Sequence, residues 1–212
     1  MKSYASSAVS ASPVAAPSRA RRIAERIAVV LLGTLFVAIC AHVSIPLWFT
    51  PVPITLEPFA VLLLALLLSP RWSAATMVVY LAEGAAGLPV FSPVGAPTLL
   101  HLFGPTAGYL LSYPVVAWLT GSLFLRFRGT GDARLRTASG FTAALAAAAI
   151  GDTVILLSGA AWLAILTHQS PATVMTLAVA PFVPGEILKV IAAAGAVSGL
   201  RRFRRIAPST TK

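Results

Sequence analysis

The sequence predicts an all-α integral membrane protein with six transmembrane helices. Its composition is the first reason: 58% of the 212 residues are hydrophobic and 10% are charged, which is too little polar surface for a soluble globule. The second reason is charge placement, since fifteen of the sixteen Lys and Arg residues fall in four short stretches. The third is that the apolar stretches are hydrophobic on every side, which favours helices over alternating barrel strands.

Six apolar stretches are candidates to cross about 30 Å of hydrocarbon, although the second and third are short. They lie at residues 23–41, 54–69, 72–86, 105–125, 138–166 and 184–200. The first twenty residues are rich in Ser, Ala and Pro, which predicts a disordered cytoplasmic tail. A membrane domain at residues 21–201 and a basic cytoplasmic tail at residues 202–212 complete the expected organisation.

The four basic stretches would all lie on one side of a six-span bundle. They are the N-terminal segment through Arg26, the turn at Arg71, the loop between Arg126 and Arg136, and the segment from Arg201 onward. The other three connections contain no Lys or Arg, so the positive-inside rule places both termini in the cytoplasm. The net charge of +10 is therefore a topology signal, and no nucleic-acid partner is expected. A signal peptide cleaved near residues 40–44 is the alternative reading of the first basic stretch.

Two of the uncharged connections are apolar and rich in proline. The first has three prolines between residues 46 and 53, beside Trp48 and Phe49. Because proline removes a backbone donor and disfavours helix before it, this stretch is predicted to be extended. The second, at residues 87–109, mixes turn-forming and aromatic residues. These segments are either interfacial loops with aromatic anchors or the lid of a ligand pocket.

Lys189 is the one basic residue inside an apolar stretch, and it follows Glu186 by three positions. Pro184 and Gly185 are expected to start a helix, which puts Glu186 in its first turn and Lys189 on the same face. A charged side chain in a membrane segment costs about 2.5 to 3.5 kcal/mol, so such residues usually serve a function. Two readings remain open: a pair whose lysine snorkels to the interface, and a pair that binds a polar ligand.

Other polar residues in the spans give weaker signals. Asp152 lies near the middle of the fifth span, where an acid is neutral, paired or lines a polar cavity. Glu57 resembles a first-turn acid, and Glu83 is expected at an interface. The three histidines, His101 among them, fall at outer ends or loops, where interfacial hydrogen bonding is expected and a metal or substrate role is the alternative. The single cysteine, Cys40, excludes a disulfide framework and a cysteine metal site.

The sequence contains none of the motifs that would indicate an enzyme. It has no phosphate-binding Gly-x-x-x-x-Gly-Lys-Ser/Thr, no His-Glu-x-x-His and no Gly-x-Ser-x-Gly. We therefore expect a binding or transport protein that does not itself use ATP through such a loop. On the first helix, Thr34 and Ala38 have the four-residue spacing of small residues that lets helices approach closely, which marks a possible partner surface.

Four motifs occur in order along the chain, at residues 44–56 (SIPLWFTPVPITL), 87–91 (GLPVF), 104–110 (GPTAGYL) and 182–189 (FVPGEILK). They resemble the successive signatures of the BioY family, the biotin-specific S components of energy-coupling factor transporters. The similarity extends from about residue 34 to residue 200. It implies a six-helix fold and a biotin pocket near the outer face of a prokaryotic plasma membrane. It also implies a transmembrane coupling protein and two ATPases as partners, and no cofactor.

The resemblance and the chemistry of biotin together give a list of expected site residues. An acid would accept from the ureido N–H groups, a lysine would serve a carbonyl or carboxylate, and aromatic side chains would form the walls. The residues expected to bind biotin are Phe49, Thr50, Phe91, Thr106, Tyr109, Asp152, Glu186 and Lys189. Thr34 and Ala38 are expected to contact the coupling protein. An S component for another vitamin, or a small membrane enzyme or assembly factor, remains the alternative.

Three positions depart from the pattern of the family. Glu186 stands where the family usually has Asp, which moves the carboxylate outward by one methylene. Glu57 stands where the family often has Gln. The segment 92–97 (SPVGAP) replaces a usually glycine-rich loop, which predicts a stiffer lid.

Overall fold

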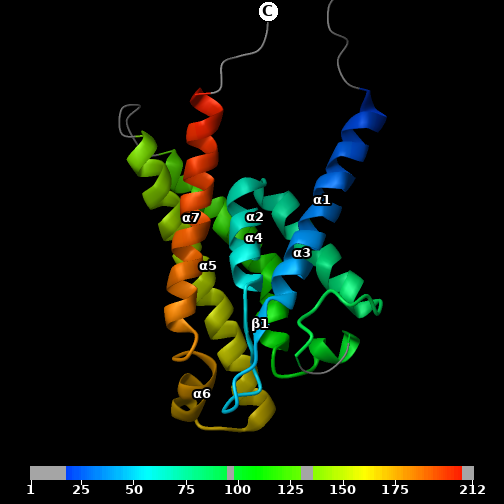
Figure 1. Ribbon diagram of the computed structural model, residues 1–212, viewed down its shortest axis with the longest axis vertical. Coiled ribbons are helices and arrows are strands. Elements are labelled where there is room, and N and C mark those ends of the chain that lie inside the picture. Colours follow the sequence, from blue (N-terminus) through cyan, green and yellow to red (C-terminus); the bar gives the residue numbers. More distant parts are fainter. Residues whose placement is uncertain (1–17, 95–97, 130–135, 207–212) are drawn as a thin grey trace, which may run out of the picture.

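The computed structural model describes residues 18–94, 98–129 and 136–206, which form a bundle of helices with one short β-hairpin (Figure 1). The elements are α1 (Arg19–His42), β1 (Ser44–Ile45), β2 (Ile54–Thr55), α2 (Glu57–Leu67), α3 (Pro70–Ala85), the 3₁₀ helix η1 (Thr98–Leu102), α4 (Ala107–Arg128), α5 (Arg136–Thr167), α6 (Pro171–Ala178) and α7 (Val183–Ile206).

The two predicted tails fall largely outside the described residues. Three residues of the N-terminal tail are described: Ser18 is the N-cap of α1, and Arg19 and Ala20 are already helical as its start. The predicted C-terminal tail begins at residue 202, whereas α7 continues to Ile206. Both boundary helices are therefore longer than the apolar stretches that predicted them, because basic residues extend them beyond the hydrophobic segment.

Each predicted apolar stretch contains a helix, but the predicted count of six spans is not confirmed. By length and composition, four helical segments can cross a membrane: α1, α4, Gly140–Thr167 of α5 and Val183–Phe203 of α7. Helices α2 and α3 have 11 and 16 residues, or roughly 16 and 24 Å at 1.5 Å per residue. Both are shorter than the roughly 30 Å of a hydrocarbon core. The short helix α6 lies in a connection for which no helix was predicted.

Proline and serine residues mark the helix starts. Pro58, Pro70 and Pro171 stand in the first turns of α2, α3 and α6, where the missing N–H would have no helical acceptor. Ser18 and Ser170 cap α1 and α6 by accepting a hydrogen bond from a first-turn backbone N–H. The predicted start of the last helix is confirmed, since α7 begins at Val183 and has Glu186 in its first turn.

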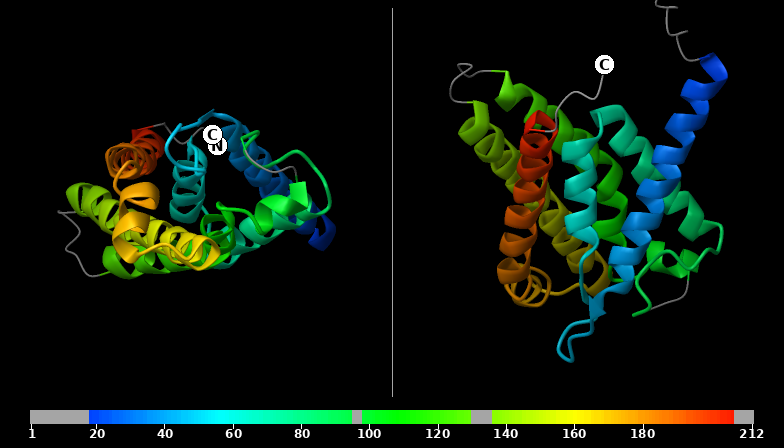
Figure 2. Two further views of the ribbon diagram at one scale, coloured as in Figure 1. Left: turned by 90° about the horizontal axis from the view of Figure 1, so that it is seen from below. Right: turned by 45° about the horizontal axis from the view of Figure 1, so that its top comes forward.

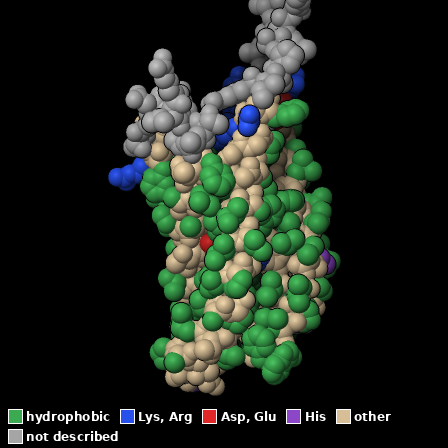
Figure 3. All heavy atoms as spheres, turned by 60° about the vertical axis from the view of Figure 1, so that its left-hand side comes forward, with side chains coloured by type: hydrophobic (Ala, Val, Ile, Leu, Met, Phe, Trp, Pro, Cys, Tyr) green, Lys and Arg blue, Asp and Glu red, His purple; other side chains and the backbone are tan. Residues whose placement is uncertain are grey.

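The bundle has two chemically different ends. Figure 1 shows that α1 and α3 begin, α4 ends, α5 begins and α7 ends at the same end of the molecule. In the described part of the chain, all Lys and Arg residues other than Lys189 lie there, and we call it the basic end. The hairpin, η1 and α6 lie at the opposite end, the loop end. Figure 3 shows apolar side chains covering the flank between the two ends.

Helix α2 lies at the centre of the bundle. It packs against α1, α3, α4, α5 and α7, and it lies between α1 and α7 when the bundle is viewed from below (Figure 2). The core residues that it contributes are Ala60, Val61, Leu62, Ala65 and Leu66. Just before α2, the hairpin pairs Ser44 with Thr55 and Ile45 with Ile54 in antiparallel register. The predicted absence of helix between α1 and α2 is confirmed.

Helices α4 and α5 form an extensive contact that depends on glycine. A Cβ atom at Gly108 of α4 would lie 2.5 Å from the carbonyl oxygen of Ser158 and would collide with Cβ of Trp162. The Trp162 indole N–H also donates to the carbonyl of Gly104 across 2.8 Å. The residues of the GPTAGYL motif therefore fix the start of α4 directly against α5.

Substituting Gly108→Ala should destabilise this contact. The new methyl group meets backbone on α5, so the helices must separate, and overpacking of this kind costs about 1 to 3 kcal/mol. We expect a lower melting temperature in detergent, measured by tryptophan fluorescence. Gly195→Ala on α7 is the matched control, because a Cβ there meets nothing within 4 Å. If the Gly108→Ala protein has the same melting temperature as the control, α4 and α5 are not closely packed at this position.

Candidate ligand-binding site

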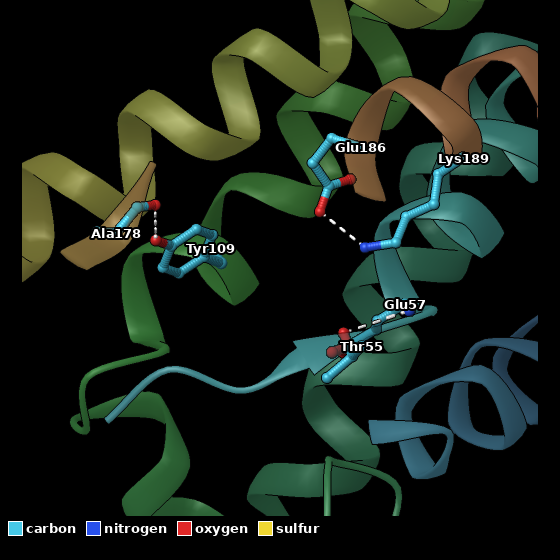
Figure 4. Close-up of polar contacts among 6 residues, drawn as sticks. All are labelled: Thr55, Glu57, Tyr109, Ala178, Glu186 and Lys189. Carbon is cyan, nitrogen blue, oxygen red and sulfur yellow. Dashed lines mark hydrogen bonds and ion pairs between the residues drawn. The ribbon is translucent and has the colours of Figure 1, made fainter. Parts of the chain in front are cut away.

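Glu186 and Lys189 form a buried ion pair on the first turns of α7. The Lys189 ammonium donates to Oε1 of Glu186 across 2.7 Å, and the two side chains point toward each other in Figure 4. The residues are 4% and 6% exposed, respectively. The lysine thus lies inside the bundle and does not extend to the surface. The second carboxylate oxygen, Oε2, is buried without a hydrogen-bond partner among the described residues.

Two further acids converge on this pair from other helices. Asp152 of α5 is buried and close enough to interact with both Glu186 and Lys189. Glu57 at the start of α2 is buried, accepts a 2.6 Å hydrogen bond from the Tyr80 hydroxyl and interacts with Lys189. This cluster holds three carboxyl groups and one ammonium group. Buried acids without matching cations are costly, so the excess of acceptors is expected to serve a ligand with N–H donors.

A cavity opens beside this cluster at the loop end of the bundle, with an empty volume of ≈ 530 Å³. Its walls come from β2, the loop after α3, η1 and the loop-end portions of α2, α4, α5 and α7. The polar residues that line it are Thr55, Glu57, Ser92, His101, Thr106 and Glu186. The aromatic residues that line it are Phe91, Tyr109, Tyr113 and Phe182. A largely apolar cavity with a few fixed polar groups is typical of a small-molecule site.

The structure brings four of the eight expected ligand residues to this cavity: Phe91, Thr106, Tyr109 and Glu186. Lys189 and Asp152 are not part of the lining but lie directly behind Glu186. The two hairpin residues lie elsewhere. Phe49 is partly exposed and packs edge-on against Trp48, while Thr50 is buried and accepts from the backbone N–H of Val52. The hairpin reaches the cavity instead through Val52, Pro53 and Thr55, because it folds back on itself.

Two of the aromatic walls pack against glycine. A Cβ at Gly159 of α5 would collide with the ring of Tyr109, and a Cβ at Gly84 of α3 would collide with the ring of Phe91. The Tyr109 hydroxyl also donates to the carbonyl of Ala178 at the end of α6 across 2.7 Å (Figure 4). The two rings therefore have fixed positions, and their faces are held by neighbouring helices.

The sequence interpretation did not select several residues that line the cavity. Tyr113 follows Tyr109 by one helical turn, and this i, i+4 spacing was a readable signal of a shared face. Phe182 directly precedes α7 and packs 6.4 Å from Tyr109. Ser92 and His101 lie in the connection between α3 and α4, where no periodicity predicts which side chains turn inward.

The expected contact of Thr34 and Ala38 with a partner protein stays a prediction. Both residues are buried, and the Thr34 hydroxyl lies 3.0 Å from a carboxylate oxygen of Glu83 on α3. Small residues at this spacing do allow close helix approach, but here the approaching helix belongs to the same chain. In this conformation, Thr34 and Ala38 pack within the chain itself.

Comparison with known proteins gives a consistent result for most of the chain. The model of the BioY family matches residues 8–206. The "Probable biotin transporter BioY" of Pyrococcus horikoshii is 30% identical over 170 residues, which are 80% of this chain and 92% of that protein. The "Biotin transporter BioY" of Rhizobium etli is 33% identical over 166 residues, 77% of this chain and 86% of that protein.

A solved structure has the same fold. It is described as the S-component for biotin from an ECF-type ABC transporter, and its similarity has a TM-score of 0.76 with 23% sequence identity. The match covers 88% of this chain and 95% of the other. With the family match over nearly the whole sequence, these findings establish that the chain belongs to the BioY family.

Proposed function

We propose that this chain takes up biotin, as the substrate-binding S component of an energy-coupling factor transporter. The observation that carries this proposal is the cavity at the loop end, which Glu186, with one unpaired carboxylate oxygen, lines together with apolar and aromatic residues. The relatives named as biotin transporters support the choice of ligand. Biotin is the transported ligand, and no cofactor takes part.

The orientation follows from the two ends of the bundle. Positively charged residues are retained on the cytoplasmic side of membranes, so the basic end and both termini are cytoplasmic. The cavity then faces the outside of a prokaryotic cell. Six segments are embedded in the plasma membrane: the four long helices and the shorter α2 and α3, with α2 enclosed by its neighbours.

The chemistry of biotin matches the cavity. Its fused rings carry a ureido group with two N–H donors and one carbonyl, and an aliphatic chain ends in a carboxylate. Oε2 of Glu186 accepts a ureido N–H, while Tyr109, Phe91 and Phe182 pack against the rings and the chain.

Lys189 and Asp152 serve the site from behind Glu186. The ammonium holds Oε1 at 2.7 Å, and Oε2 keeps its capacity to accept a hydrogen bond from a ligand. The longer side chain of Glu, compared with the Asp usual in the family, lets one carboxylate reach both the lysine and the cavity. Asp152 supports this arrangement from α5.

Transport requires partners that supply energy. The chain has no phosphate-binding loop, so two ATPase subunits provide ATP hydrolysis and a transmembrane coupling protein links them to this chain. The small residues Thr34 and Ala38 of α1 remain the proposed contact with the coupling protein.

The purified protein should bind biotin in detergent. Isothermal titration calorimetry is expected to show saturable heat with biotin and none with riboflavin or thiamine, because only the first ligand offers ureido N–H groups to Glu186 next to a carboxylated chain. Saturable binding of another vitamin without biotin binding would refute the proposed specificity. Absence of binding by all three would refute the S-component assignment to this cavity.

Replacing Lys189→Met should weaken biotin binding at least about tenfold. Removing the ammonium leaves Glu186 as a buried carboxylate without its cation, and breaking a buried pair in this way costs about 3 to 5 kcal/mol. The melting temperature of the unliganded protein should fall as well. Arg202→Met, which removes an exposed charge at the basic end, is the matched control. Unchanged affinity in Lys189→Met would show that the pair is only structural.

Replacing Gly159→Ala should displace the ring of Tyr109 from its position at the cavity wall. The expected result is roughly tenfold weaker biotin binding, equivalent to about 1.4 kcal/mol of lost aromatic contact. Gly199→Ala on α7 makes the same chemical change where a Cβ meets nothing within 4 Å, and it should bind like the unmodified protein. Equal affinities for the two variants would exclude Tyr109 from ligand contact.

A further inference from the structure

His101 is a buried imidazole in the cavity wall with no hydrogen-bond partner. It belongs to η1 and is 5% exposed, and within the described residues neither Nδ1 nor Nε2 has a partner. Its ring lies 5.7 Å from that of Phe91, which itself packs edge-on against Tyr80 at 5.4 Å. Packing therefore holds the imidazole in place although its polar atoms are unsatisfied.

Other polar groups that line the cavity do have hydrogen-bond partners, unlike the imidazole of His101. The Glu57 carboxylate accepts from Tyr80, the Tyr109 hydroxyl donates to Ala178, and the Ser92 hydroxyl accepts from the backbone of Val94. Among fully buried side-chain atoms that line the cavity in the described segments, the unpaired ones belong to His101 and Glu186. Buried polar atoms without partners are costly and rare, and in a binding cavity they indicate the positions of ligand atoms.

These two unpaired groups come from opposite sides of the bundle. Glu186 belongs to α7, which packs against α2 and α5, whereas η1 packs against α3 and α4. Figures 1 and 2 show α7 and η1 on opposite sides of the central helices in both views. A ligand that satisfies both groups must be elongated, with an apolar middle and a polar group at each end.

We propose that His101 binds the carboxylate of the ligand through a ring N–H, while Glu186 accepts from the ureido end. This assignment rests on the proposed function and adds the residue that recognises the second end of biotin. The charges around the cavity decide which end of biotin lies at His101 and which lies at Glu186. Glu57 and Glu186 repel a carboxylate, and the Lys189 ammonium is held by Glu186 outside the cavity lining. In the described part of the lining, His101 is the nitrogen donor that remains for an anion.

The substitution His101→Phe separates ligand recognition from structural support. Phenylalanine keeps a planar ring against Phe91 but removes both unpaired nitrogens. The unliganded protein should therefore melt at the same temperature or higher, while biotin affinity falls by about 10- to 100-fold, as expected for a lost charge-assisted hydrogen bond. His42→Phe on α1 is the matched control, because His42 bonds the Ala38 carbonyl and does not line the cavity.

Biotin methyl ester identifies the end of the ligand that is recognised. The ester keeps the ureido group and the chain but has no anionic charge, so His101→Phe should reduce its affinity less than about threefold. An equal loss for biotin and its ester would overturn the carboxylate assignment. Biotin affinity that is unchanged in His101→Phe, or a variant that loses affinity and unliganded stability together, would overturn a ligand-binding role for His101.

The same measurements keep this inference distinguishable from the proposed function. If the unmodified protein gives no saturable heat with biotin, the proposed function fails irrespective of His101. If the unmodified protein binds biotin and His101→Phe binds it equally well, the function stands and the inference fails.

Discussion

The need to bury charge inside an apolar bundle is the constraint on which the site depends. Glu186 and Lys189 satisfy most of each other's requirements within one helix, and they do so only because α2 and α5 exclude water and lipid around them. Glu57 of α2 and Asp152 of α5 also interact with Lys189, so acidic side chains from three helices meet at this ion pair. Helix α2 is short and contributes a large share of the core, with Ala60, Val61, Leu62, Ala65 and Leu66 buried.

Much of the fold was predictable because apolar stretches and basic flanks are strong signals in membrane proteins. Every predicted stretch contains a helix, and the start of α7 with Glu186 in its first turn was predicted correctly. The number of spans was less predictable, since an apolar segment of 11 residues can be a short span or an enclosed core helix. Helix α6 was not predicted, because the segment between α5 and α7 was interpreted as a loop.

The site was predicted only in part, and the reason is physical. In a membrane protein, lipid-facing and protein-facing side chains are both apolar. Hydrophobicity therefore does not predict which face of α1 packs against the rest of the bundle, or that Thr34 lies on that buried face. Tyr109 and Glu186 were found because their motifs resemble those of the family. Phe49 does not line the cavity and His101 does, and neither placement was predictable because no simple sequence period determines the conformation of an irregular loop.

The cavity is assembled from segments that are far apart in the sequence, and this has a consequence for biosynthesis. Its walls begin at Val52 and end with Glu186, so α7 is the last of them to leave the ribosome. Until α7 is in place, Asp152 of α5 lacks both Glu186 and Lys189, with which it interacts in the finished protein. The addition of one late helix therefore completes the charged cluster and the cavity in a single step.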